Sequence, residues 1–401
     1  MVVSAAAEPP LAVALYVHVP FCRSKCAYCD FYSLAGHEQL QPAFVDAALF
    51  EAGHWSHYDL LDDVPSLYVG GGTPTALGGE LPRLVAGLLE TACLRSDAEI
   101  TVETNPETTD AALVDALVAA GVGRFSLGVQ SFDDAVLRVL GRPHDARRAA
   151  DAARLLAASG ASLSLDLICG APGQTEASWR GTLHRAVETG ASHLSVYPLS
   201  VEGGTPLEAT VAAGSVAAPD PDVAAEMMLT AESVLRDAGL YRYEVANYAR
   251  PGNESRHNLV YWQGGAYLGI GPHAASMLPF RALRDVASSE CWALGQLAED
   301  GQPARARFSR DVQLLDYLKG PLASPGPFEL LSAAQTARED VMLGLRLVRG
   351  VTHAAVEAAG LPEVLRRLEG EGLVESEDGR WRTTERGWLL GNRVFGAVWN
   401  G

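Results

Sequence analysis

The chain has 401 residues, of which 48% are hydrophobic and 20% are charged, a composition close to that of ordinary globular proteins. A chain of this length can bury a large core and is expected to divide into two or three domains. The formal net charge is −18, from 31 Lys and Arg against 49 Asp and Glu. An excess of negative charge makes nonspecific binding of nucleic acid through a basic face unfavourable, although a local basic pocket is still compatible with it.

The N-terminal segment, residues 1–15, is apolar but contains no Lys or Arg and includes Pro9 and Pro10. A secretory signal needs a basic start and a longer apolar run, so we interpret this segment as a frayed terminus. No stretch of the sequence approaches the uncharged length of a membrane span. We therefore expect a cytoplasmic protein without stable membrane insertion.

Strand-like and helix-like patterns alternate from residue 11 to about residue 200. Strands are predicted at 11–19, 66–69, 99–103, 124–130, 163–168 and 193–199, with helices near 42–51, 81–91, 110–120, 147–158 and 176–188. Six β-then-α units with short connections predict a parallel sheet with helices outside it. Glycine and polar residues gather at or just after the strand ends, which favours a partial barrel over a doubly wound sheet. These residues are Cys22, Gly70–Thr73, Glu103, Gln130, Asp166 and Tyr197.

The second half of the chain is less regular. Residues 201–222 lose periodicity and gather Pro and Gly, which predicts a long surface loop before a helix at 223–238. A helix near 332–349, two short helices and a hairpin-like run at 372–387 follow the order of a winged-helix domain. Because no basic recognition helix is present, we expect a docking or lid domain rather than a DNA reader. The predicted domains are a barrel at 1–210, a linker and barrel-completing region at 211–325, and a smaller, mainly α C-terminal domain at 326–401.

The chain has six cysteines, and three of them, Cys22, Cys26 and Cys29, follow the first strand with the spacing C-x3-C-x2-C. Six cysteines in a chain of this length do not form a disulfide framework, so the cluster indicates a metal site. The single cysteines 93, 169 and 291 are expected to be small buried hydrophobic residues.

Three thiolates leave one iron of a [4Fe–4S] cluster without a protein ligand. Such an open position suits the amino and carboxylate groups of S-adenosylmethionine (SAM). A structural zinc site is the alternative, but zinc prefers four ligands, and Asp30, His18 and His37 do not lie at the usual spacing.

The sequence around these cysteines resembles the radical SAM family that contains the oxygen-independent coproporphyrinogen III dehydrogenases and the heme chaperone HemW. The resemblance extends over nearly the whole chain. It rests on YVHVPFCRSKCAYCDFYS, GGGTPT, ETNPE, SLGVQSF, LGRPH, DLICGAPGQT, HNLVYW and GLRLVRGV. It implies a partial (β/α)6 radical SAM barrel with a smaller C-terminal domain, a [4Fe–4S] cluster and SAM.

The resemblance also implies a set of SAM-binding residues. The glycine run with Gly71, Gly72 and Thr73 would accept the amino group of SAM, and Glu103 would pair with the same group. Gln130, Arg142 and Asp166 would hold nucleoside hydroxyls or the carboxylate, while Tyr16 and Tyr28 would line the site. Two simpler alternatives remain, in which Arg142 pairs with Asp145 and Asp166 caps a turn. Whether the chain binds one SAM or two stays open.

Two features of the resemblance bear on function. The dehydrogenases carry a further cysteine two residues after the third, where this chain has Phe31. The chaperone branch has Phe there, together with an H-N-x-x-Y-W motif that matches residues 257–262. An imidazole can bind heme iron and aromatic rings can cover a porphyrin, so His257 is the candidate heme residue, with His144 and His273 as further possible ligands. Two segments depart from the family pattern, Ala171 in place of Leu and the less glycine-rich run 269–276.

The resemblance therefore implies a HemW-like heme chaperone that holds a SAM-ligated [4Fe–4S] cluster. Its partners would be heme, a heme-acceptor protein, and a flavodoxin- or ferredoxin-type electron donor. One alternative is an oxygen-independent coproporphyrinogen III dehydrogenase, and another is a heme-binding module whose SAM chemistry is vestigial. Reductive cleavage of SAM is expected in the first two, and the sequence leaves open whether the protein is an enzyme.

Overall fold

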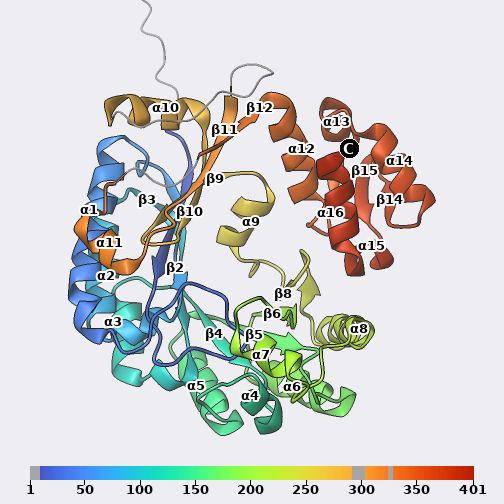
Figure 1. The fold of residues 1–401 in the computed structure, drawn as a ribbon, viewed down its shortest axis with the longest axis horizontal. Coiled ribbons are helices and arrows are strands. Elements are labelled where there is room, and N and C mark those ends of the chain that lie inside the picture. Colours follow the sequence, from blue (N-terminus) through green and yellow to red (C-terminus); the bar gives the residue numbers. More distant parts are fainter. Residues whose placement is uncertain (1–9, 291–302, 324–327) are drawn as a thin grey trace, which may run out of the picture.

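The computed structural model describes residues 10–290, 303–323 and 328–401 (Figure 1). The expectations for residues 1–9 and for Cys291 lie outside these ranges. Within them, every helix is too short or too polar to cross a lipid bilayer.

Six parallel strands lie side by side in chain order and form the centre of the sheet: β1 (Val13–Val19), β2 (Val64–Gly71), β3 (Leu94–Thr104), β4 (Arg124–Gln130), β5 (Ser162–Cys169) and β6 (His193–Pro198). The connecting helices cover the outer face (Figure 1): α1 (Gln41–His57), α2 (Glu80–Thr91), α3 (Ala111–Ala119), α4 (Asp134–Val139), α5 (Ala146–Ala158) and α6 (Glu176–Glu188). Short 3-10 helices lie at Glu38–Leu40, Pro74–Leu77 and Pro106–Thr108. The predicted partial (β/α)6 barrel is confirmed.

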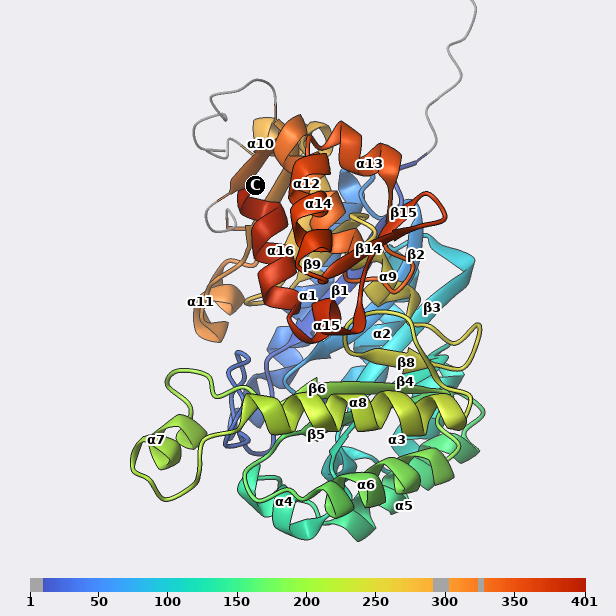
Figure 2. The same cartoon turned by 90° about the vertical axis from the view of Figure 1, so that its right-hand side faces the viewer.

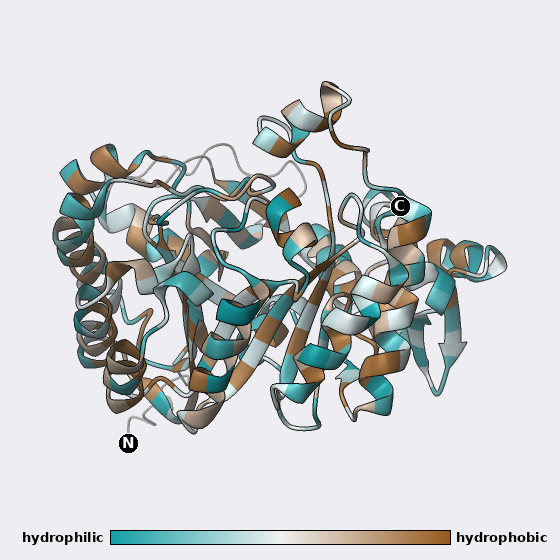
Figure 3. Cartoon of the chain, turned by 90° about the horizontal axis from the view of Figure 1, so that it is seen from below, coloured by the Kyte–Doolittle hydropathy of each residue, from teal (hydrophilic) through white to brown (hydrophobic). Residues whose placement is uncertain are grey.

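The local sequence explains these elements. Every residue of β4 is buried, as expected for a parallel strand covered on both faces. Several outer helices begin where a side chain caps them: Asp110, Asp145 and Thr175 each accept a hydrogen bond from a backbone N–H one turn later. The helices are amphipathic, with apolar and polar residues on different faces (Figure 3). They bury the apolar face against the sheet.

The sheet continues beyond the six predicted units on both edges. On one side β9 (Ala266–Ile270) pairs with β1 in parallel, followed by the antiparallel strands β10 (Ala275–Pro279), β11 (Pro303–Ser309) and β12 (Glu329–Ser332). On the other side lie β8 (Asn247–Ala249) and β7 (Tyr241–Arg242). The described strands form an open sheet, since β12 and β7 end it without pairing to each other.

Five more helices accompany these strands: α7 (Pro206–Ala212), α8 (Pro221–Asp237), α9 (Arg256–Trp262), α10 (Phe280–Ser289) and α11 (Leu314–Lys319). The expectation of an irregular loop over 201–222 is wrong in part, because α7 lies inside it. Thr205 caps this helix by accepting a hydrogen bond from the Glu208 N–H, and Pro206 occupies the first helical position, where its missing N–H is not needed. Helix α8 runs along β5 and β6 (Figure 2).

The C-terminal region has its own apolar core, which includes Leu345, Leu365 and Val394. Helix α12 (Ala333–Gly344) begins at a capping box formed by Ser332 and Gln335. The helix–helix–hairpin order follows as α13 (His353–Ala358), α14 (Pro362–Gly370), β14 (Val374–Glu377) and β15 (Arg380–Thr383). The short strand β13 (Val351–Thr352) pairs with β15, and α15 (Glu385–Leu389) and α16 (Gly391–Asn400) end the chain.

One expectation about the single cysteines is wrong. Cys169 is buried at the end of β5, as predicted, but Cys93 is exposed. Cys93 lies in the connection from α2 to β3, where its backbone pairs with Leu61 and Val64 and its side chain faces outward.

Candidate functional site

The three clustered cysteines lie in a loop that follows β1 at the carboxyl edge of the parallel strands. The loop is closed by backbone hydrogen bonds from Leu34 to Pro20 (2.8 Å) and from Cys22 to Leu34 (3.0 Å). All three thiols are free and partly exposed. They line one cavity of about 520 Å³, which we call the cysteine cavity.

The cysteine cavity gathers most of the predicted site residues. Besides Cys22, Cys26 and Cys29, its wall contains Tyr28, Gly71, Gly72, Thr73, Glu103, Gln130, Arg142 and Asp166. These side chains come from the ends of β1 to β5 and from their connections. The polar residues and glycines that the sequence places at the strand ends therefore lie around one cavity.

Three thiolates from one loop match the donor set of a [4Fe–4S] cluster with one open iron. Among the described residues, no three His, Cys, Asp or Glu side chains converge on one metal-ion position. A [4Fe–4S] cubane does not require this, because each thiolate binds a different iron. Burial raises the pKa of the Cys22 and Cys29 thiols, so iron binding must displace their protons. Arg142 Nη1 donates to Cys26 Sγ at 3.1 Å, a contact that stabilises a thiolate.

The glycine run after β2 is required by the close approach of neighbouring groups. Gly71 has φ +111°, and a Cβ there would lie 2.8 Å from the His18 ring. At Gly72 a Cβ would lie 2.7 Å from the Phe21 carbonyl oxygen and 3.1 Å from Cys22 Sγ. Only glycine leaves this part of the wall open to a ligand.

Glu103 forms part of the wall just beyond these glycines. It accepts hydrogen bonds from the Tyr68 hydroxyl (2.8 Å) and from the Gly71 N–H (2.9 Å). Burial, together with repulsion from Asp166, raises the pKa of Glu103 to about 7. The carboxylate therefore lacks a cationic partner in the described structure, and an ammonium group in the cavity would supply one.

Arg142 does not pair with Asp145, which instead caps α5. Its guanidinium donates to Asn105 Oδ1 at 2.7 Å and to the Gly128 carbonyl at 2.8 Å, and among the described residues its buried Nε has no partner. The sequence analysis missed Asn105, which also donates to the Thr73 hydroxyl at 2.7 Å. Its position at a strand end, two residues after Glu103, could have identified Asn105 as a site residue.

Asp166 and Gln130 also face the cysteine cavity. Asp166 does not cap a turn, since it lies within β5 and accepts hydrogen bonds from Ser126 Oγ at 3.2 and 3.3 Å. Gln130 ends β4 with φ +64°, a conformation that non-glycine residues rarely adopt and that often marks a ligand-binding position.

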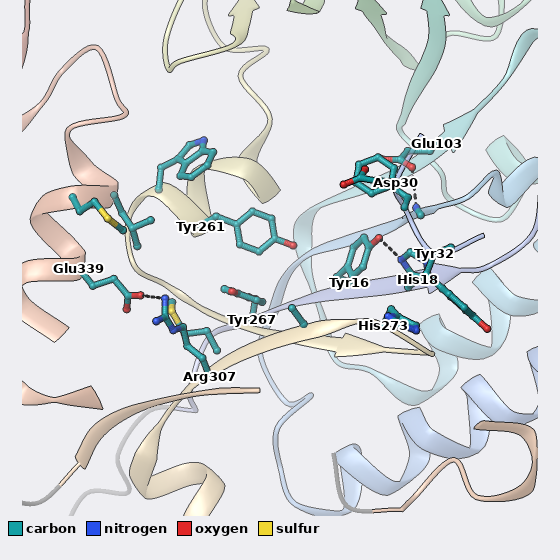
Figure 4. Close-up of a pocket in the computed structure, with 17 residues that line it drawn as sticks. Tyr16, His18, Asp30, Tyr32, Glu103, Tyr261, Tyr267, His273, Arg307 and Glu339 are labelled. Atoms are coloured by element: carbon teal, nitrogen blue, oxygen red, sulfur yellow. Dashed lines mark hydrogen bonds and ion pairs between the residues drawn. The ribbon is translucent and has the colours of Figure 1, made fainter. Parts of the chain in front are cut away.

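A second cavity, of about 600 Å³, lies beside the first and reaches to α12 (Figure 4). We call it the aromatic cavity, because its wall includes Tyr16, Phe31, Tyr32, Tyr261, Trp262 and Tyr267. The two cavities share Asp30, Phe31, Gly71 and Glu103. Tyr16, expected near SAM, lies in this second wall, where its hydroxyl shares a 3.0 Å hydrogen bond with His18 Nδ1.

His257 borders neither cavity. It is 1% exposed, and its ring nitrogens share hydrogen bonds with Ser66 Oγ (2.9 Å) and the Tyr261 hydroxyl (2.8 Å). Burial lowers its pKa to about 3. Both ring nitrogens are hydrogen-bonded in this conformation, so binding of heme iron by His257 would require one of these bonds to break. Its selection as the heme candidate stays a prediction. The third histidine considered, His144, is likewise bonded through both nitrogens.

Comparison with known proteins agrees with this geometry. The family model of the radical SAM superfamily matches residues 16–186, and that of the HemN C-terminal domain matches residues 331–390. The heme chaperone HemW of Mycobacterium tuberculosis is 36% identical over 391 residues, covering 96% of this chain and 94% of that protein. The chain belongs to the HemW family of radical SAM proteins.

Other relatives of this HemW-family chain support the assignment. The heme chaperone HemW of Bacillus subtilis is 30% identical over 95% of this chain and 98% of its own. The mouse mitochondrial radical S-adenosyl methionine domain-containing protein 1 is 42% identical, over 65% of this chain and 60% of that protein. The solved structure of Escherichia coli coproporphyrinogen III oxidase (HemN), a radical SAM enzyme, has a TM-score of 0.79 at 23% identity, covering 98% and 91% of the two chains. That likeness shows the shared fold. Membership of the superfamily implies a [4Fe–4S] cluster and SAM, and the cysteine cavity suits both.

Proposed function

We propose that this protein is a heme chaperone that holds heme in the aromatic cavity, beside SAM and a [4Fe–4S] cluster in the cysteine cavity. It would pass the heme to an acceptor protein and take electrons from a flavodoxin- or ferredoxin-type donor in the cytoplasm. The names of the full-length relatives support the chaperone activity, and the fold supports the SAM site.

The observation that carries the proposal is the junction of the two cavities. Asp30 and Phe31 come from the cysteine loop, whereas Gly71 and Glu103 come from β2 and β3, and all four border both cavities. The aromatic cavity, at about 600 Å³, lies within the size range of small-molecule sites, and its aromatic wall suits a flat porphyrin.

In this arrangement the residues of the cysteine cavity bind and orient SAM. Cys22, Cys26 and Cys29 would each hold one iron, Glu103 would pair with the SAM ammonium group, and Arg142 would support the thiolate of Cys26. When bound, the cluster supplies the electron for reductive cleavage of SAM. The assignment of these individual roles is part of the proposal.

Phe31 bears on the alternative function, the oxygen-independent dehydrogenation of coproporphyrinogen III. The residue is 64% exposed and borders both cavities. A phenyl ring offers neither a ligand nor a proton at this junction, but it can pack on a porphyrin face. The position of Phe31 therefore supports ligand binding rather than the dehydrogenase reaction.

The experiment is an anaerobic titration. The protein is reconstituted with iron and sulfide, heme is added while absorbance is recorded, and coproporphyrinogen III turnover is tested with SAM and a reductant. One saturable heme equivalent without turnover supports the chaperone. Clear turnover to protoporphyrinogen IX would instead identify a dehydrogenase, and the absence of saturable heme binding would refute the proposal.

A further inference from the structure

One end of the aromatic cavity carries a permanent positive charge. Arg307, on β11, is the one Lys or Arg among the described residues that line this cavity. Figure 4 shows Arg307 beside Glu339, at the opposite end of the cavity from Glu103. The rings of Tyr261 and Tyr267 lie between the two ends (Figure 4). The wall therefore offers aromatic surface in its middle and a guanidinium group at the end far from the cysteine cavity.

Two arginines of β11 hold one carboxylate of α12. Glu339 accepts hydrogen bonds from Arg305 Nη1 at 2.6 Å and from Arg307 Nη1 at 2.5 Å, and its side chain is only 2% exposed. Arg305 is itself fixed, because it also donates to Asp340 Oδ1 (2.8 Å) and to the Gly264 carbonyl (3.1 Å). Hydrogen bonds between ionised groups are strong when they are shielded from water. The Nη1 side of the Arg307 guanidinium is therefore anchored.

The Nη2 side of the same guanidinium is paired more weakly. Nη2 donates to Glu329 Oε1 at 2.6 Å, but the side chains of Arg307 and Glu329 are 30% and 55% exposed. Ion pairs with this exposure contribute little to stability, because water competes for both partners. Nη2 can therefore exchange Glu329 for another carboxylate while Nη1 stays on Glu339.

We propose that Arg307 binds a propionate carboxylate of heme through Nη2, in the place of Glu329. This inference rests on the proposed function, since it takes heme as the ligand of the aromatic cavity. An anchored guanidinium suits this task, because its donors already point in fixed directions and match the geometry of a carboxylate. Arg305 and Glu339 are positioning residues that orient Arg307, and Glu329 is the competitor that the ligand displaces.

This contact also sets the orientation of the heme. Its propionate edge lies at Arg307, beside the exposed Glu329, so that the second propionate can stay in water. The porphyrin ring then extends along Tyr261 and Tyr267 toward Phe31, where the two cavities meet. Charged groups remain at the wet end of the cavity, and the apolar ring is covered by aromatic side chains.

The test compares heme with its dimethyl ester, which keeps the iron and the macrocycle but has lost both negative charges. Each compound is titrated, with absorbance as the readout, into the cluster-reconstituted parent, Arg307→Met and Arg307→Lys. Arg180→Met is the control, since Arg180 is an exposed, ion-paired arginine on the outer helix α6. We expect the parent to bind heme at least about tenfold more tightly than the ester. This preference should be lost in Arg307→Met, reduced in Arg307→Lys and unchanged in the control.

Glu329→Gln gives the decisive second measurement, because it should change binding in the opposite direction. It removes the competing charge at an exposed position, so heme should bind up to about fivefold more tightly, whereas the ester should bind as it does to the parent. A role for this ion pair in stability alone would not produce such a gain.

Three results would overturn the inference while heme binding stands: equal affinity of the parent for heme and ester, a preference for heme that survives in Arg307→Met, or no gain in Glu329→Gln. If the parent binds neither compound, the proposed function fails as well.

Discussion

Replacing Glu103 with Gln tests whether this carboxyl group is maintained for a cationic ligand at the expense of stability. Its pKa rises from 4.5 to about 7 in the folded protein, chiefly through burial and then through repulsion from Asp166. Between these two pH values the folded state keeps a proton that the unfolded state has lost. The raised pKa therefore lowers stability progressively as the pH rises through this window.

The size of the effect follows from the pKa difference. One pH unit of difference corresponds to about 1.4 kcal/mol, so the ionised carboxyl destabilises the protein by at most about 3 kcal/mol at pH 8. Gln has no charge to bury and can still accept a hydrogen bond from the Gly71 N–H. We expect Glu103→Gln to raise the midpoint of denaturant unfolding of the cluster-free protein at pH 8, and to change it little at pH 5.

The same substitution should weaken SAM binding, because Gln cannot neutralise an ammonium group. For the parent protein, the ionised fraction of Glu103 falls about tenfold between pH 8 and pH 6. We expect the Kd for SAM, measured by calorimetry on the reconstituted protein, to rise by about the same factor, whereas the variant should show weak binding at both pH values. Equal SAM affinity in parent and variant would refute the assigned role of Glu103. Equal unfolding midpoints at pH 8 would refute the raised pKa.

Five further substitutions, in three groups, test the remaining roles. Ser at position 22, 26 or 29 should each remove the visible absorbance of the reconstituted cluster and abolish reductive SAM cleavage, as seen by the loss of 5′-deoxyadenosine in chromatography. Arg142→Lys keeps a positive charge but loses the planar set of donors, so it should shift the cluster reduction potential in protein-film voltammetry and weaken SAM binding. His257→Ala leaves two buried hydroxyl groups unpaired, at about 1–3 kcal/mol each, and should lower the melting temperature in circular dichroism. An unchanged melting temperature in His257→Ala would contradict the structural role given to that residue.

The barrel half of the fold could be predicted because each β-then-α unit carries a strong local signal. Strand β4 is a continuous buried run, and helices such as α3 and α5 begin at Asp caps that are visible in the sequence. The site followed from the same pattern, since polar residues at the ends of parallel strands must meet at one edge. Glu103 and Asp166 were found in this way.

The added strands β7 to β12 could not be predicted with the same argument. Several have only two to five residues. That is too few for the alternation of apolar and polar residues that marks a strand to be recognised in the sequence. Their pairing depends on contacts far along the chain, such as β9 lying beside β1. The burial of His257 could not be predicted for a related reason: the sequence shows a histidine among aromatic residues, but not that Ser66, 191 positions earlier, hydrogen-bonds to one of its nitrogens.

Helix α9 explains why its HNLVYW sequence is informative even though its histidine is buried. Asn258 borders the cysteine cavity, and Tyr261 and Trp262 border the aromatic cavity. These residues are three and four positions apart, so they lie on one face of the helix, about one turn from each other. His257 fixes this helix to β2 through Ser66 and to its own Tyr261. The motif therefore builds a wall shared by the two cavities.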